Sequence, residues 1–445
     1  MSNILEQHHS QICSGDKIWA RALKKCSRNH KMHTCAVGRN IKVAAMLNRA
    51  IFGLLLLVAL STALVFAEAQ AAEETVDFLS LKKAQYCTTD KCQLPDCRCS
   101  GLRLPSAEFR GHEKEIPQLI TVTFDDAVNV INYEQYQQLF DGLVNPDNCS
   151  AQGTFFVSHE YTDYTLVNAL YQQGHEIALH SVTHGSGTGT DYWREADVER
   201  LMAEFGQQME MLEKFAKVNR TDIKGMRLPF LQMAGNNSFE AAKRLGLLYD
   251  SSWPTQRYRN PAMWPYTLDY RSVQDCQIGS CPNAAIPGLW VNPMVSWVDT
   301  AGYSCAMLDG CIYQPKDQVD TLFNWMLENF DRHYEGNRAP FGMYLHAAWF
   351  QRGQHHFEAL RKFLRHVNTL PDVYLTTGSR VIEYMQHPSL GKPFNGCPKK
   401  PQTTCVKHNC GLRKVESGEI RYMKVCDSCP EVYPWLGNPL GLSEY

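Results

Sequence analysis

The chain has 445 residues, which is long enough for one large α/β domain with smaller appendages. Its 44 Lys and Arg nearly balance its 46 Asp and Glu, and no basic stripe runs along the sequence. A nucleic-acid partner is therefore not expected, because recognition of phosphates needs concentrated positive charge.

An uncharged apolar run covers residues 50–67, with Arg49 before it and small residues after it up to Ala72. This order is typical of a secretory signal peptide, except that 45 residues precede Met46. We therefore expect 1–45 to be an upstream extension that is not translated or not retained, and 46–71 to be the signal peptide. The mature protein should be secreted, with no stable membrane span after cleavage. The alternative is a signal anchor that leaves 1–45 in the cytosol.

Fourteen of the 17 cysteines follow the apolar run. An even, high count in a secreted chain predicts up to seven disulfides. Residues 72–115, which hold four of these cysteines, are expected to form a disulfide-tied N-terminal collar. The competing interpretation is a zinc site built from Cys405, Cys410, Cys426 and Cys429. Three sequons, at Asn148, Asn219 and Asn236, fit a glycosylated, lumenal path.

Strand-like and helix-like segments alternate from residue 116 onward, which predicts parallel βαβ units. The strand-like runs are 119–124, 153–157, 177–180, 246–249 and 341–346. The helical candidates are 133–143, 163–173, 194–217, 237–245, 317–334 and 355–367. Residues 254–316, rich in proline and cysteine, are expected to be an irregular insertion that shapes one wall of a cleft. A Cys-rich tail, 391–445, has no clear periodicity.

Polar side chains end two of these strand-like runs. Asp125 and Asp126 close the first run, and His180 and His184 follow the third. One carboxylate and two imidazoles leave positions open on a divalent metal, and the second carboxylate can act as a base toward water. Either pair alone is weak evidence, since an Asp-Asp pair after a strand belongs to a turn or a helix cap about as often as to a functional site. The Gly-rich segment 185–189 favours a strand end over a helix for the two histidines.

The order of the motifs resembles the NodB-type polysaccharide deacetylases of carbohydrate esterase family 4, and more closely the insect-type chitin deacetylases. The matching segments are Thr123–Asp126, His180–His184, Arg227–Phe230, Asp250–Trp253 and Leu345–His346. The resemblance covers residues 116–390, and residues 421–437 resemble the C-terminal tail of the animal members. It implies an α/β fold, a distorted, incomplete (β/α) barrel with disulfide-rich N- and C-terminal extensions, and a site at the C-terminal strand ends.

The resemblance also implies a role for individual residues. Asp126, His180 and His184 would bind Zn²⁺, or another divalent metal such as Co²⁺. Asp125 would be the general base and His346 the general acid. The remaining roles would be those of Arg227 (partner of the base), Phe230 (backbone N–H to the oxyanion), Asp250 (tuning of the acid), Leu345 (acetyl-methyl pocket), and Trp253 and Trp290 (walls of a sugar subsite). For His346 the alternative is a core histidine, and for either tryptophan it is plain core.

The expected function is a secreted, metal-dependent chitin deacetylase that converts N-acetylglucosamine units to glucosamine, giving chitosan and acetate. It should act as a monomer on chitin or chitin oligosaccharides. Two alternatives stay open: a deacetylase of another N-acetylated glycan such as peptidoglycan, and a catalytically silent chitin-associated matrix protein. The complete ligand set and base argue against the silent protein. No peritrophin-type chitin-binding module is expected, because the collar has four cysteines where such a module needs six.

Overall fold

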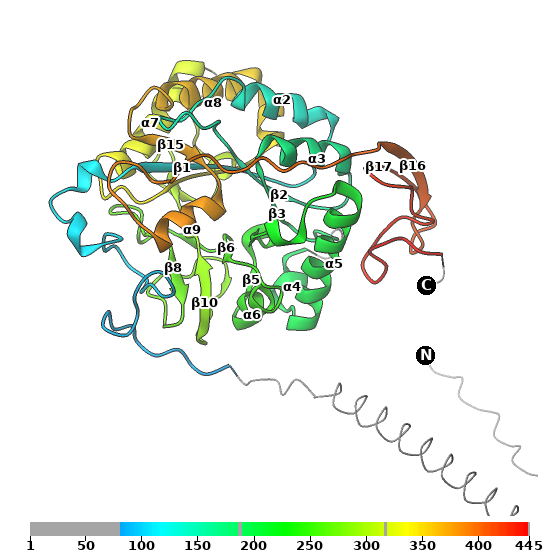
Figure 1. The fold of residues 1–445 in the computed structure, drawn as a ribbon, viewed down its shortest axis with the longest axis horizontal. Coiled ribbons are helices and arrows are strands. Elements are labelled where there is room, and N and C mark those ends of the chain that lie inside the picture. The colour runs from blue at the N-terminus through cyan, green and yellow to red at the C-terminus, as the bar shows by residue number, and fades with distance from the viewer. Residues whose placement is uncertain (1–80, 186–188, 316–317, 444–445) are drawn as a thin grey trace, which may run out of the picture. The chain divides into compact units, whose positions relative to one another are not determined.

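The computed structural model describes residues 81–185, 189–315 and 318–443 (Figure 1). The predicted upstream extension 1–45 and signal peptide 46–71 lie outside the described residues. All of the described chain belongs to one compact unit, Ser80–Tyr445. Across these described ranges, no helix combines the length and the apolar character that crossing a membrane requires.

A curled sheet of nine strands forms the centre of this unit (Figure 1). Its order is β14-β1-β2-β3-β4-β6-β10-β8, with β15 also paired to β1. Every pairing in it is parallel except that between β10 and β8. The strands are β1 (Gln118–Asp125), β2 (Thr154–Val157), β3 (Glu176–Leu179), β4 (Gly225–Met226), β6 (Tyr249–Asp250), β8 (Tyr266–Leu268), β10 (Ile286–Val291), β14 (Phe341–His346) and β15 (Val373–Thr376). The expected incomplete (β/α) barrel is confirmed.

Helices follow most of the parallel strands and pack around the sheet (Figure 1). They are α2 (Val130–Phe140), α3 (Tyr164–Gln173), α4 (Gly189–Arg194), α5 (Val198–Ala216), α6 (Asn236–Arg244), α7 (Val319–Tyr334), α8 (Gln354–Val367) and α9 (Gly378–Gln386). In α5, Leu201, Phe205 and Leu212 are fully buried, as their helical spacing predicts. The side chain of Asp197 accepts the N–H of Arg200 and so caps the start of this helix. All six helical candidates are confirmed within a few residues.

Residues 254–316 are more than the irregular insertion expected from the sequence. They supply β8 and β10, and β10 continues the parallel sheet beside β6. Three further short pairs lie outside the main sheet: β5 (Met233–Ala234) with β9 (Gly279–Ser280), β7 (Pro254–Thr255) with β11 (Met294–Val295), and β12 (Trp297–Val298) with β13 (Ser304–Cys305). β8 and the short pairs have only two or three residues per strand and leave almost no periodic signal. β10 has six residues, but Pro287 and Gly288 interrupt its apolar pattern.

The tail also contains regular structure that its sequence did not reveal. An antiparallel hairpin, β16 (His408–Arg413) and β17 (Ile420–Val425), packs against α3, and the N–H of Cys426 donates to the Phe215 carbonyl at the end of α5. Its inward side chains, among them Leu412, Met423 and Val425, are buried, while the alternate residues are exposed. This alternation is the period-2 pattern of a half-buried hairpin.

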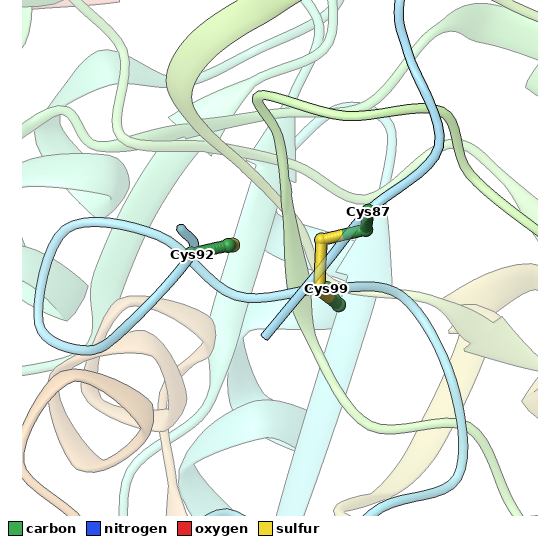
Figure 2. A group of neighbouring side chains, drawn as sticks. All are labelled: Cys87, Cys92 and Cys99. Carbon is green, nitrogen blue, oxygen red and sulfur yellow. A yellow bond between two sulfur atoms is a disulfide. The ribbon is translucent and has the colours of Figure 1, made fainter. Parts of the chain in front are cut away.

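Seven disulfides join all fourteen cysteines of the described chain, as their even number predicted. The pairs are Cys87–Cys99, Cys92–Cys97, Cys149–Cys397, Cys276–Cys281, Cys305–Cys311, Cys405–Cys426 and Cys410–Cys429. The alternative of a zinc site in the tail is therefore wrong, because oxidised sulfurs are not thiolate ligands. Cys87, Cys92 and Cys99 also have sulfurs that lie close together, in the collar (Figure 2). They are disulfide-bonded too, so they do not form a metal site either.

His175 makes the stability of this fold sensitive to acid. It is 5% exposed, and its Nδ1 accepts the N–H of Gly153 at 3.0 Å, which requires a neutral ring. Burial, with a contribution from Lys400, lowers its pKa from 6.5 to about 3. Between these values the unfolded chain binds a proton that the folded chain does not, so stability falls as the pH falls.

We therefore expect His175→Gln to reduce the pH dependence of the unfolding free energy between pH 6 and 5 by about 1 kcal/mol per pH unit. Denaturant unfolding of wild type and variant at both pH values measures the difference. His387→Gln, at an exposed position, is the control and should keep the wild-type slope. Equal slopes in wild type and His175→Gln would contradict the assignment.

Candidate active site

The predicted site residues meet at the C-terminal edge of the sheet. Asp125 and His346 are the last residues of β1 and β14 and lie opposite each other in register. His180 directly follows β3, and Arg227 directly follows β4, where its N–H donates to the Leu179 carbonyl at 2.9 Å. Parallel strands bring their carboxyl ends to one edge, so residues far apart in the sequence become neighbours.

The side chains of Asp126, His180 and His184 point ligand atoms toward one common position. The Nε2 atoms of His184 and His180 lie 3.2 and 3.8 Å from Oδ1 of Asp126. His180 Nδ1 donates to the Arg227 carbonyl at 2.8 Å, which leaves the lone pair of Nε2 facing Asp126. A partner at the second ring nitrogen is the usual way in which proteins orient a metal-binding histidine. The donor set and its convergence therefore fit a divalent cation such as Zn²⁺.

Two buried polar residues of α5 hold the segment that carries these histidines. Glu204 accepts the N–H groups of Val182 and Thr183 at 3.0 and 2.9 Å. Gln208 accepts the N–H groups of His180 and Ser181 at 3.0 and 2.8 Å. Both side chains are fully buried. Sequence reasoning missed them, although two polar residues four apart on the apolar face of a helix were a usable signal.

Asp125 is buried and faces the same point with its second oxygen. Its Oδ1 accepts Nη1 of Arg227 at 2.5 Å, and its Oδ2 lies 3.9 Å from Nε2 of His180. Burial acts to raise the pKa of Asp125, but the Arg227 guanidinium, helped by His180 and His346, outweighs it and holds the pKa below its ordinary value. The carboxylate is therefore ionised and available as a base at neutral pH.

Arg227 is itself fully buried, so its pair with Asp125 is a buried ion pair and not a surface one. Its guanidinium lies over the ring of Phe156 at 4.0 Å and donates through Nε to the Ser251 carbonyl at 2.7 Å. Nη1 also donates to Thr123 at 2.9 Å. These contacts fix the arginine, and the arginine in turn fixes the orientation of Asp125.

The His346 side chain is about one-third exposed and lies at the end of β14, opposite Asp125 of β1. Its Nε2 lies 4.0 Å from Oδ2 of Asp126, and its Nδ1 lies 2.8 Å from Oδ2 of Asp309. Burial acts to lower the pKa of His346, but Asp309 outweighs it, with help from Asp125 and Asp126, and raises the pKa to about 9. The imidazole therefore carries a proton that it can donate at neutral pH.

The carboxylate that bonds His346 is not the expected Asp250 but a different aspartate. Asp250 is buried and accepts the N–H of Ser252 at 2.9 Å and the Ser252 hydroxyl at 2.5 Å. Burial raises its pKa to about 6. The carboxylate bonded to His346 belongs to Asp309 in the short 3₁₀ turn Leu308–Gly310. No motif marked Asp309, because its role depends on where a cysteine-bracketed loop folds back.

The two tryptophans do not form walls of a sugar subsite. Trp253 is 0% exposed and Trp290 is 1% exposed, so neither offers a ring face to a substrate. Trp253 donates its Nε1–H to the Asp275 carbonyl at 2.8 Å, and Trp290 packs in the core with Tyr249. The sequence-based expectation for both residues is therefore wrong, and the plain-core alternative holds.

Phe230 and Leu345 complete the set of predicted residues. Phe230 follows Pro229 with φ of 58°, and its half-exposed ring lies 5.2 Å from that of His184. A positive φ in a residue with a Cβ is strained and is often found at functional sites. Leu345 is fully buried in β14, next to His346. Their roles toward the oxyanion and the acetyl methyl group stay predictions.

The chain is similar in sequence to known proteins. Residues 112–249 match the polysaccharide deacetylase family. The chain is 43% identical over 366 residues to chitin deacetylase 8 of Bombyx mori, covering 81% of this chain and 94% of the relative. It is 35% identical over 384 residues to chitin deacetylase 1 of Bombyx mori, covering 82% of this chain and 70% of the relative. A crystal structure from Mycobacterium smegmatis, assigned to a polysaccharide deacetylase, is 21% identical with a TM-score of 0.44, covering 69% and 100% of the two chains.

Proposed function

Because the chain belongs to the polysaccharide deacetylase family, we propose that it is a chitin deacetylase. The reaction adds water across the amide of an N-acetylglucosamine unit and yields acetate and a free amine on the sugar. The observation that carries the proposal is one cluster of groups: Asp126 with two imidazole nitrogens, flanked by an ionised and a protonated side chain. Amide hydrolysis needs both a base and an acid, since an amine is a poor leaving group.

The base and the acid are assigned from their surroundings. Asp125 accepts a proton from the attacking water at Oδ2, since Oδ1 is held by Arg227. His346 donates a proton from Nε2 to the departing amine nitrogen, while its Nδ1–H stays bonded to Asp309. Asp126, His180 and His184 would hold a divalent metal, Zn²⁺ or Co²⁺. When bound, this cation supplies positive charge beside the acetamide oxygen and makes water more acidic.

Each of the two carboxylate–cation pairs stabilises the protonation state that the proposed mechanism requires. Arg227 favours the ionised form of Asp125, and Asp309 favours the protonated form of His346. Groups whose surroundings push their pKa values apart are the usual signature of an acid–base pair. In the same proposal, the Phe230 N–H would stabilise the tetrahedral oxyanion and Leu345 would contact the acetyl methyl group.

Chitin is favoured over other N-acetylated glycans by the relatives rather than by the geometry of the site. The 43% identity spans nearly the whole of a chitin deacetylase. A catalytically silent matrix protein is disfavoured, because the base, the acid and the ligand set are all present. Seven disulfides within the described residues support a secreted protein. We propose that it acts as a monomer, which light scattering on purified material would check.

Acetate release tests the substrate directly. The purified protein should release acetate from chitin oligomers, lose this activity with a chelator and regain it with zinc, and act far less on muramyl glycans. Preferential release from muramyl glycans would support the peptidoglycan alternative, and no release from any glycan would support the silent protein. N-terminal sequencing of the exported protein would check secretion, because we expect it to begin near residues 68–72.

A further inference from the structure

A hollow lies beside His346, and the proposed mechanism gives it no role. It has a volume of about 550 Å³, within the range of about 300–1,000 Å³ that is usual for ligand pockets. His346 and Asp309 line one part of it, and Tyr303, Ile312 and Arg352 line others. The hollow therefore opens beside the group that would protonate the leaving amine.

Large apolar side chains stand exposed around this hollow. Of the residues that line it, Tyr303 is 65% exposed and Ile312 is 84% exposed. Tyr313, which lies next to Tyr303 but does not line the hollow, is 51% exposed. The rings of the two tyrosines lie 5.9 Å apart, inclined by 32°. Exposed apolar side chains that gather in one place usually mark a binding surface, whereas single ones need no explanation.

Hydrogen bonds of the buried Asp299 hold these aromatic residues in place. The Asp299 carboxylate accepts the N–H groups of Ala301, Tyr303 and Tyr313 at 3.0, 2.9 and 3.3 Å. The Asp299 N–H in turn donates to the Tyr303 carbonyl at 2.9 Å. The disulfide Cys305–Cys311 closes the same loop. A ring held out by a rigid backbone loses little conformational entropy when a ligand covers it.

The same loop carries the partner of the acid. Asp309 lies between Cys305 and Cys311, and the Arg352 side chain donates to its carbonyl at 2.9 Å. The aromatic surface and His346 are thus held by a single short segment. A sugar chain whose reacting nitrogen lies at His346 would run its next ring into this hollow.

We propose that the hollow is a sugar subsite for the ring adjacent to the one that loses its acetyl group, with Tyr303 as its stacking face. The apolar C–H face of a pyranose covers an aromatic ring well, and Ile312 extends this apolar surface. The inference rests on the proposed function, because it takes the ligand to be a chain of N-acetylglucosamine units. It replaces the buried Trp253 and Trp290 with residues that can contact a substrate.

Tyr303→Ala tests this subsite with chitin oligomers of two to five units. The KM for the pentamer should rise about 5- to 10-fold, the effect of losing one aromatic stacking contact of roughly 1 kcal/mol or slightly more. The fall in KM on lengthening the oligomer from two to five units should shrink, and kcat should change by less than about 2-fold. Tyr303→Phe keeps the ring face and should keep the KM of wild type.

Two further variants make the result decisive. Ile312→Asn changes a side chain too exposed to matter for folding and should raise the pentamer KM about 2- to 3-fold. Tyr422→Ala removes a tyrosine of β17 that is 82% exposed and lies outside the hollow, and should leave all constants unchanged. An unchanged KM in Tyr303→Ala would overturn the proposal, as would an equal loss at every oligomer length through kcat.

The failure of the proposed function would look different. Wild type would then release no acetate from chitin oligomers but would act on another N-acetylated glycan. If Tyr303→Ala raised the KM for that glycan in a length-dependent way, the subsite would stand with a different sugar chain. If it did not, the subsite would be refuted independently of the substrate.

Discussion

Replacing Asp125 with asparagine should lower kcat at least about 100-fold, which is the usual scale for removing a general base. The variant should still bind about one divalent metal per chain. Asparagine keeps the shape of the side chain but cannot take a proton from water. Asp126, His180 and His184 are unchanged, so the ligand set is preserved. Acetate release and elemental analysis of the metal content measure the two effects separately.

The same substitution should also destabilise the fold. Arg227 would lose its charged partner while it stays fully buried, and an unpaired buried charge of this kind costs about 3–5 kcal/mol. Thermal unfolding must therefore show that the variant is folded at the assay temperature. Asp141→Asn, an exposed carboxylate after α2, is the matched control and should retain activity. Full turnover in Asp125→Asn, or an active protein without metal, would refute the mechanism.

Replacing Asp309 with asparagine should lower kcat about 10- to 100-fold at neutral pH, the usual cost of removing such a supporting partner. It should also move the alkaline limb of the pH–rate profile to lower pH. The Asp309 carboxylate contributes most to the raised pKa of His346, about 9 against an ordinary 6.5. Without it the pKa falls, the acid loses its proton at lower pH, and activity is lost first on the alkaline side.

The pH profile of kcat distinguishes this positioning role from a purely structural one. A loop that merely lost its shape would lower kcat without moving the limb. Asp250→Asn is the matched comparison, because the sequence motif assigned the tuning role to Asp250 whereas its hydrogen bonds go to Ser252. The alkaline limb should stay in place in Asp250→Asn. A limb that moved in Asp250→Asn and not in Asp309→Asn would restore the expectation from the motif.

Local patterns in the sequence predicted parallel βαβ units and part of the sheet, whereas the incomplete barrel and most candidates for the site followed from the resemblance to a known family. Apolar runs predicted β1, β2, β3 and β14, because these strands are buried on both faces, and helical spacing predicted six helices, because each buries one face. The even number of cysteines predicted the disulfides but left their pairing open. The motifs also predicted that Asp126, His180 and His184 would come together, and the structure brings them together at one edge of the sheet.

Only the tertiary structure decided which side chains are partners and which are accessible. Asp309 reaches His346 across 37 residues because a disulfide-closed loop folds back over β14. Trp253 ends a motif and Trp290 was a second candidate wall, yet packing buries both, while the unmarked Tyr303 stands exposed at the hollow. Periodicity and spacing predict which helix or strand a residue belongs to and which face of it is buried. Partners supplied by a distant loop depend on the path of the whole chain, which carries no local signal.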